Sequence, residues 1–282
     1  MSANTAKPLL PDVFGDVLRY VPIDKRIKMA KKIPQLRATL KKTPFTFYCP
    51  VEIRGLLRSE EKIFVKIGGK RISKREWNSK EIFIRYLKKY LFRKEITFRK
   101  LTVHFNGSGS SDWIGALPAD IEYPKIVCLE YLGTRKPNDR EHFPGLRVES
   151  AILATGNRGT LVIDPIKNAR RLRIDFLGEN RLNSLSHCQA THLTIRRGRS
   201  LDPNILDKFA TGRMETGSTL EWMGEEDCKT QIEEFLQKYP CDKVEGEEGK
   251  VNYVLNFPNG TKLSIWVKEN DQQWEFLNLE IL

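Results

Sequence analysis

The sequence predicts a mixed α+β fold, in which a short N-terminal three-helix module (residues 8–44) precedes a β-rich α/β domain (residues 45–282). Prolines divide residues 8–44 into segments whose apolar side chains recur at helical spacing, whereas runs typical of strands begin at Phe45. Further strand-like runs follow at intervals of 21 to 27 residues. Residues 250–282 have the pattern of a β-meander, so β structure should dominate the second part of the chain.

Length and composition are those of a globular protein. The 282 residues are 40% hydrophobic and 30% charged, which supplies enough apolar surface for a packed core and argues against global disorder. No apolar run approaches the roughly 18 residues of a membrane-spanning helix, and the N-terminus lacks the pattern of a signal peptide. Five widely spaced cysteines favour reduced thiols. We therefore expect a cytoplasmic or nuclear protein with no membrane partner.

Charge is distributed unevenly along the chain. The net charge is +12, but residues 1–100 carry 26 Lys/Arg against 9 Asp/Glu, whereas residues 201–282 carry 8 against 17. A basic N-terminal part favours an acidic partner, which could be nucleic acid, an anionic membrane surface or an acidic protein.

The N-terminal module is predicted from its prolines and its apolar spacing. The first helix has these apolar side chains at helical spacing: Val13, Val17, Leu18 and Val21. Pro22 ends it, Asp24 can cap a second helix that ends before Pro34, and a third short turn covers residues 36–40. So short a unit cannot bury all its apolar side chains alone. Those expected to stay partly exposed are Leu10, Val17, Leu18, Val21 and Ile27.

The clearest helix follows a first group of strands. Residues 45–71 contain strand-like runs with a Gly68-Gly69 turn near their end. Asn78 and Glu81 then form a capping box for the helix that follows. The apolar stripe of this helix consists of Ile82, Phe83, Tyr86, Leu87, Tyr90 and Leu91.

Six short apolar runs recur along the middle of the chain. They begin near Leu101, Ile126, Val148, Leu172, Leu193 and Leu220. One strand per roughly 20–29 residues is typical of an irregular leucine-rich-like array, although an ordinary α/β domain also has strands at such distances. Several connections are too short for full crossover helices, which favours the array. The sequence does not decide between the leucine-rich-like array and the ordinary α/β domain.

The C-terminal part combines a helix with a hairpin. One face of the helix carries Ile232, Phe235, Leu236 and Tyr239. Pro240 ends the helix, and Asn259-Gly260 provides turn residues between the segments VNYVLNF and TKLSIWV. The segment EFLNLEIL is expected to add a third strand.

The sequence contains no catalytic or metal-binding motif. Its histidines are His104, His142, His187 and His192, and the group His187-Cys188 with His192 lacks the second ligand pair that structural zinc needs. A nucleophile elbow, an HExxH motif, a Walker A loop and a Rossmann fingerprint are absent. Residues 107–112 lack the lysine and helix of a phosphate-binding loop. We therefore predict no catalytic, cofactor-binding or metal-binding residues, and a protein that is not an enzyme.

Nucleic-acid binding is an alternative function. The basic side chains of residues 62–100 that could follow a phosphate backbone include Lys66, Lys70, Arg71, Lys74, Arg75, Lys88, Lys89, Arg93 and Arg99. The aromatic side chains available for stacking are Phe64, Trp77, Phe83 and Tyr86, and three of the four occupy core-facing positions. A second basic group, at residues 170–173 and 196–199, alternates with apolar residues as on the solvent face of a sheet.

The N-terminal module resembles an F-box. The matching positions are Leu10, Pro11, Val17, Leu18, Tyr20, Val21, Pro22, Asp24 and Arg26, with Ala30 and Ile33 on the next helix. The order of a Leu-Pro pair, the phrase VLRYVP and a basic helix is similar to that motif. The wider layout resembles nematode F-box-like proteins with an F-box-associated domain, in which a β-rich domain ends in a hairpin similar to FPNGTKLSIWV.

This resemblance implies a substrate-recognition adaptor of an SCF-type cullin-RING ubiquitin ligase. Residues 8–44 would bind the acidic Skp-type adaptor of the ligase, and residues 45–282 an unknown target protein. The residues that would contact the Skp-type adaptor are Leu10, Pro11, Val17, Leu18, Tyr20, Val21, Ile27 and Ala30. Pro34-Gln-Leu-Arg stands where the box usually ends in a Cys-Lys-Trp type sequence. A box-derived binding module that no longer docks a ligase is therefore a further alternative.

Overall fold

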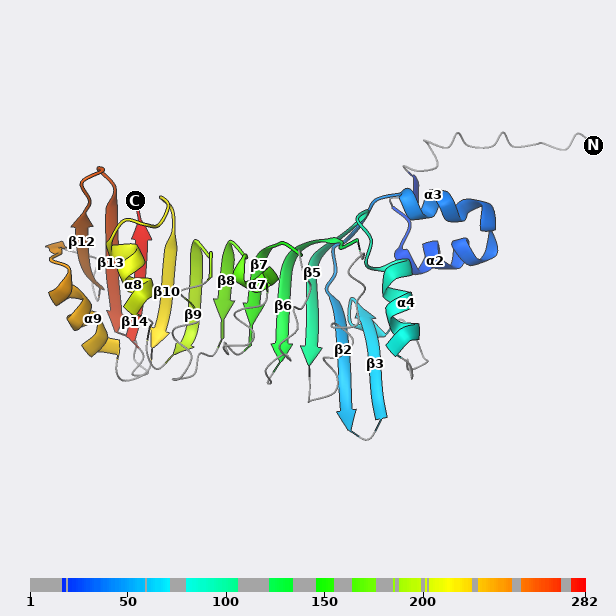
Figure 1. The fold of residues 1–282 in the computed structure, drawn as a ribbon, viewed down its shortest axis with the longest axis horizontal. Coiled ribbons are helices and arrows are strands. Elements are labelled where there is room, and N and C mark those ends of the chain that lie inside the picture. The colour runs from blue at the N-terminus through cyan, green and yellow to red at the C-terminus, as the bar shows by residue number, and fades with distance from the viewer. Residues whose placement is uncertain are drawn as a thin grey trace, which may run out of the picture.

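A computed structural model of the chain describes the N-terminal helical segment, a large sheet and the helices associated with it. The described residues are 17–18, 20–58, 60–71, 80–105, 122–133, 146–154, 164–175, 185, 188–198, 201, 203–224, 228–244, 250–269 and 275–282. Figure 1 shows an elongated molecule, with strands side by side along its length and N-terminal helices at the end opposite the C-terminal strands.

One mixed sheet of fourteen strands forms the body of the molecule. The strands are β1 (Phe45–Phe47), β2 (Val51–Arg58), β3 (Glu60–Ile67), β4 (Lys70–Arg71), β5 (Ile96–Phe105), β6 (Lys125–Gly133), β7 (Val148–Leu153), β8 (Arg171–Ile174), β9 (His192–Gly198), β10 (Thr219–Gly224), β11 (Asp242–Val244), β12 (Lys250–Asn256), β13 (Lys262–Glu269) and β14 (Glu275–Ile281). Their spatial order is β11-β12-β13-β14-β10-β9-β8-β7-β6-β5-β2-β3-β4, and β1 pairs with β5.

Helices occupy the N-terminal end and some of the connections between strands. They are α2 (Ile23–Lys32), the 3-10 helix η1 (Pro34–Leu36), α3 (Arg37–Lys42), α4 (Lys80–Tyr90), α7 (Asp164–Lys167), α8 (Pro203–Ala210) and α9 (Cys228–Lys238). Helix α2 has no side-chain cap at Pro22, which stands directly before it. The capping role predicted for Asp24 is therefore wrong, because Asp24 lies inside the helix.

Strand pairing divides the sheet into a parallel centre and antiparallel ends. Strands β2, β5, β6, β7, β8, β9 and β10 each run parallel to the next in that order. Strands β3 and β4 extend one end by antiparallel pairing. Strands β14, β13, β12 and β11 extend the other end in the same way.

The parallel register explains the recurring apolar runs of the sequence. One row of buried side chains crosses the sheet through Leu101, Leu129, Ala151, Leu172, Leu193 and Leu220. A second row, two residues further along each strand, contains Val103, Tyr131, Leu153, Ile174, Ile195 and Trp222. Because side chains alternate between the faces of a strand, both rows lie on one face. Buried residues of α4, α8 and α9 join the same core.

Several local predictions are confirmed. All six recurring runs form strands, and helices α4 and α9 lie where the apolar spacing placed them. The Asn259-Gly260 segment is the turn of a β12–β13 hairpin, and β14 is the predicted third strand. Asn78, the predicted cap of α4, lies outside the described residues.

The predicted fold class is wrong. The molecule is dominated by one continuous sheet, and the described residues show no three-helix N-terminal module. Residues 8–16, which hold most of the first predicted helix, lie outside them. Helices α2 and α3 lead directly into β1, which pairs with β5 in the sheet. The meander of β12, β13 and β14 continues the same sheet as the parallel strands, because β14 pairs with both β10 and β13.

Candidate binding surfaces

The face of the sheet opposite the apolar core carries polar side chains. One register row on this face contains Glu52, Thr102, Glu130, Ile152, Arg173, Thr194 and Glu221. Thr102 Oγ1 donates a hydrogen bond to Glu130 Oε2 at 2.7 Å, and Thr194 Oγ1 to Glu221 Oε2 at 3.3 Å. Cross-strand polar pairs of this kind hold neighbouring strands in register.

Charge on the polar face is positive at β8 and β9. Arg171 and Arg196 are exposed, and Arg173 is half-buried beside them. Asp175 forms ion pairs with Arg173 at 2.8 Å and with Arg196 at 3.7 Å. The sequence-based interpretation of these arginines as the solvent face of a sheet is thereby confirmed, and such a surface suits contact with an acidic partner.

Two histidines lie on the same polar face, outside that row. His104 lies on β5, on the same face as Lys100 and Thr102. Burial, followed by the charge of the neighbouring Arg54, lowers the pKa of His104. His192 Nδ1 lies 3.1 Å from Thr219 Oγ1 on the neighbouring strand. His142 and His187 lie outside the described residues, and no group of three potential metal ligands occurs in the part of the chain that is described. Within that part, no helix is long and apolar enough to cross a membrane.

The predicted docking residues of the N-terminal segment differ in exposure. Val17 and Tyr20 are 50% and 87% exposed, and Val21 is partly exposed. Leu18 is only 1% exposed, so the expectation that it stays available to a partner is wrong. Ile27 and Ala30 lie in α2, and Leu10 and Pro11 lie outside the described residues.

Arg26, one of the positions that match the F-box, has a structural role that the sequence did not indicate. Its Nε donates a hydrogen bond to the carbonyl oxygen of Val21 at 2.9 Å. Its guanidinium carbon lies 4.6 Å from the centre of the Phe45 ring on β1. Burial, followed by the charge of Arg93, lowers the pKa of Arg26 to about 10. Arg26 therefore links α2 to the sheet by a cation–π contact and cannot serve a partner at the same time.

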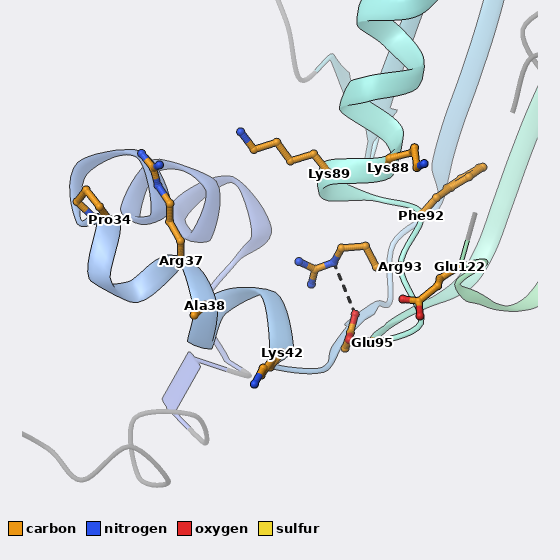
Figure 2. Close-up of a pocket in the computed structure, with 10 residues that line it drawn as sticks. All are labelled: Pro34, Arg37, Ala38, Lys42, Lys88, Lys89, Phe92, Arg93, Glu95 and Glu122. Carbon is orange, nitrogen blue, oxygen red and sulfur yellow. Dashed lines mark ion pairs between the residues drawn. The ribbon is translucent and has the colours of Figure 1, made fainter. Parts of the chain in front are cut away.

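A basic cleft lies between the N-terminal helical segment and the end of α4. The basic cleft has a volume of about 710 Å³. Its lining residues are Pro34, Arg37, Ala38, Lys42, Lys88, Lys89, Phe92, Arg93, Glu95 and Glu122 (Figure 2). Figure 2 shows the side chains of Lys89 and Arg93 extending toward the helix that carries Arg37. The lining therefore brings together five cationic side chains and two carboxylates.

Strand pairing creates the basic cleft. Strands β1 and β5 are parallel, with Phe45 paired to Ile96, and the Phe45 amide donates a hydrogen bond to the Glu95 carbonyl oxygen at 2.9 Å. The segments that precede the two strands, α3 and the turn after α4, must therefore meet at the same end of the sheet. This non-local pairing places Lys42 close to Arg93, which no spacing in the sequence could indicate.

The basic cleft contains three residues from the predicted nucleic-acid-binding region. Lys88, Lys89 and Arg93 line it, whereas Lys74 and Arg75 lie outside the described residues. Among the aromatic candidates for stacking, Phe83 belongs to the apolar core, as a core-facing position predicts. Phe64 is also buried, but it lies on the opposite face of the sheet, where it pairs with Arg54. Tyr86 packs against the core, and Trp77 is outside the described residues.

Comparison with known proteins gives no family for this chain: no family model, no curated protein and no solved structure matches it. The likeness to nematode F-box-like proteins therefore remains a prediction from the N-terminal residues and the hairpin.

Proposed function

We propose that the chain is a non-enzymatic adaptor, in which the N-terminal segment docks the acidic Skp-type subunit of a cullin-RING ubiquitin ligase. The observation that carries this proposal is the exposure of Tyr20 and Val17, at 87% and 50%, within the segment that resembles an F-box. Large apolar side chains at the surface beside polar residues are typical of protein-binding sites. Lys25, Lys28 and Lys32 on α2 are exposed close by in the chain, and their charge would speed encounter with an acidic partner.

The target protein would bind to the polar face of the sheet. This face extends across the parallel strands, and its side chains alternate with those of the core. A rigid sheet that presents many polar groups in fixed register can recognise a partner without moving. In this proposal the adaptor holds two proteins together and carries out no bond chemistry itself.

The first test is co-purification of the full chain with the Skp-type adaptor at low and high salt. Tyr20→Asp should weaken binding by more than about tenfold, because it places a charge in an apolar contact. Tyr48→Asp is the matched control, since Tyr48 is also exposed, at 76%, but lies after the N-terminal segment. Binding that survives high salt and is lost only in Tyr20→Asp would support docking through apolar contacts.

Two outcomes would contradict docking. Equal binding by the Tyr20→Asp and Tyr48→Asp variants would move the contact away from the N-terminal segment. Failure of the unmodified chain to bind at either salt concentration would instead favour the alternative of a module that no longer docks a ligase.

A nucleic-acid-binding function is the second candidate, and the basic cleft is the observation that favours it. Lys88, Lys89 and Arg93 come from one short stretch of the chain and line the cleft with Arg37 and Lys42. Binding of this kind would weaken steeply with salt and would be lost when Lys88, Lys89 and Arg93 are neutralised. Titration of a labelled oligonucleotide at several salt concentrations measures both effects.

A further inference from the structure

Three arginines lie together on the polar face of β8 and β9. Arg171 and Arg173 are two residues apart on β8, so their side chains leave the sheet on the same face, about 7 Å apart along the strand. Arg173 pairs with Thr194, and Arg196 lies two residues beyond Thr194 on the neighbouring strand β9. The register therefore places three guanidinium groups over two adjacent strands. We call Arg171, Arg173 and Arg196 the arginine group.

One carboxylate balances the charge of the arginine group only in part. Asp175 Oδ1 lies 2.8 Å from Arg173 Nε and 3.7 Å from Arg196 Nε, so two arginines share one oxygen atom. Among the described residues, Arg171 forms no ion pair. The hydrogen bond described for Glu221, on β10, comes from the Thr194 hydroxyl and not from an arginine. The arginine group therefore carries more positive charge than Asp175 neutralises.

The arginine group is accessible to a partner. The side chains of Arg173 and Arg196 are 36% and 52% exposed, and Arg171 is exposed as well. The side chain of Asp175 is 38% exposed, so its ion pairs are screened by solvent and are held weakly. Carboxylates of another protein can therefore reach these guanidinium groups, whose planar forks match carboxylate geometry.

Apolar side chains adjoin the arginine group on the side of β7 and β6. Ile152 on β7 pairs with Arg173 and is partly exposed. Leu132 on β6 lies on the same face and is also partly exposed. Apolar side chains beside arginines are typical of the centre of a protein-binding site. Single-stranded nucleic acid would instead need aromatic rings for stacking, and the described residues of β6 and β7 place none on this face.

We propose that the arginine group and Ile152 bind an acidic segment of the target protein, in which glutamate or aspartate side chains flank an apolar residue. The carboxylates contact the guanidinium groups, and the apolar side chain packs on Ile152. Charge complementarity selects such a segment, because a basic segment would be repelled. This inference rests on the proposed role of the polar face in target binding. It does not depend on ligase docking, because Tyr20 lies in the N-terminal segment and not on this face.

The test is a titration of the full chain, at low salt, with four labelled probes. These are the peptide Gly-Glu-Glu-Leu-Glu-Glu-Gly, the same peptide with glutamine in place of glutamate, the same peptide with glycine in place of leucine, and a short single-stranded oligonucleotide. We expect the acidic peptide with leucine to bind at least about tenfold more tightly than the glutamine peptide, because several exposed charge contacts act together. Replacement of its leucine by glycine should weaken binding about threefold, because apolar contact with Ile152 is lost.

Paired variants locate the site. The double variant Arg171→Gln/Arg196→Gln should weaken binding of the acidic peptide about fivefold or more, because two exposed charge contacts are removed. Its control, Arg85→Gln/Arg213→Gln, removes the same charge at exposed positions on α4 and after α8, and should bind as the unmodified chain does. Asp175→Asn should instead tighten binding about threefold, because it frees two guanidinium groups for the peptide. Loss of folding cannot produce such a gain.

Several results would overturn the inference. They are equal affinity for the acidic and glutamine peptides, equal affinity for the leucine and glycine peptides, equal effects of both double variants, weaker binding after Asp175→Asn, or no binding of the acidic peptide at all. Tighter binding of the oligonucleotide would assign this face to nucleic acid instead. The Tyr20→Asp variant should bind the acidic peptide normally, and Arg171→Gln/Arg196→Gln should still bind the Skp-type adaptor. Failure of this inference and failure of ligase docking can therefore be told apart.

Discussion

Asp207 joins two helices of the molecule through one carboxylate. It accepts hydrogen bonds from Lys238 Nζ at 2.9 and 3.0 Å and from the Tyr239 hydroxyl at 2.7 Å, so α8 is tied to the end of α9. The hydrogen bond from Lys238, followed by that from Tyr239, lowers the pKa of Asp207. Because the folded-state pKa is the lower one, the carboxylate contributes stability that is present above its unfolded-state pKa of about 3.9. This stability is lost as pH falls through the folded-state pKa.

Asp207→Asn should lower the thermal midpoint on the order of 1–3 °C at pH 7, a small change because the ion pair is exposed. The difference from the unmodified chain should be the same at pH 5 and should shrink only below about pH 4. Thermal unfolding followed by circular dichroism across this range measures it. Glu234→Gln, at an exposed position on α9, is the control and should have no such effect. A difference that already shrinks between pH 7 and pH 5 would contradict the assignment.

At the scale of elements, the β12–β13 hairpin depends on its turn glycine. The backbone φ angle of Gly260 is 86°. The Gly260 amide donates a hydrogen bond to the Phe257 carbonyl oxygen at 3.0 Å, and the Phe257 amide donates one to the Thr261 carbonyl oxygen at 3.0 Å. A Cβ added at Gly260 would meet nothing within 4 Å. The backbone conformation is therefore the only feature of this position that requires glycine.

Gly260→Ala should destabilise the chain by about 1 kcal/mol, because an alanine is unfavourable at this φ. Gly260→Asn should cost less, since asparagine adopts the left-handed region more readily than other residues with a Cβ. Urea unfolding of the two variants beside the unmodified chain gives both values. If alanine and asparagine destabilise equally, the turn conformation is not what selects glycine here.

Elements that depend on local sequence were predictable, whereas their assembly was not. The apolar stripe between residues 82 and 91 predicted α4, and Asn259-Gly260 predicted the β12–β13 hairpin. Both patterns can be read from a few neighbouring residues. The position of β14 between β10 and β13 depends on pairing of segments far apart in the chain, which periodicity does not encode. The basic cleft was missed for the same reason, since it follows from the pairing of β1 with β5. At single residues, spacing did not separate the exposed Val17 from its buried neighbour Leu18.

At the scale of the whole molecule, the apolar core is concentrated under the sheet. One cluster of buried side chains includes residues from β1 to β14 and from helices α4, α8 and α9. Leu18 and Leu40 of the N-terminal segment are buried but lie outside that cluster. Among the described residues, the backbone connects this segment to β1, and Arg26 contacts Pro44 and Phe45. The boundary predicted at residues 44 and 45 therefore stays a prediction that unfolding can test.

Hydrogen–deuterium exchange of the full chain should separate the two regions. Amides of α2 and α3 should exchange roughly a hundredfold faster than those of β6–β8, because fewer buried contacts oppose local opening. Leu40→Ala should speed exchange in α2 and α3 alone, whereas Leu129→Ala, which removes a fully buried side chain of β6, should speed exchange across the parallel strands. Equal protection in both regions, or an effect of Leu40→Ala that reaches β6–β8, would mean that the helical segment and the sheet unfold together. The helical segment would then be a cap of the sheet, and any partner that binds Tyr20 would stabilise the whole molecule.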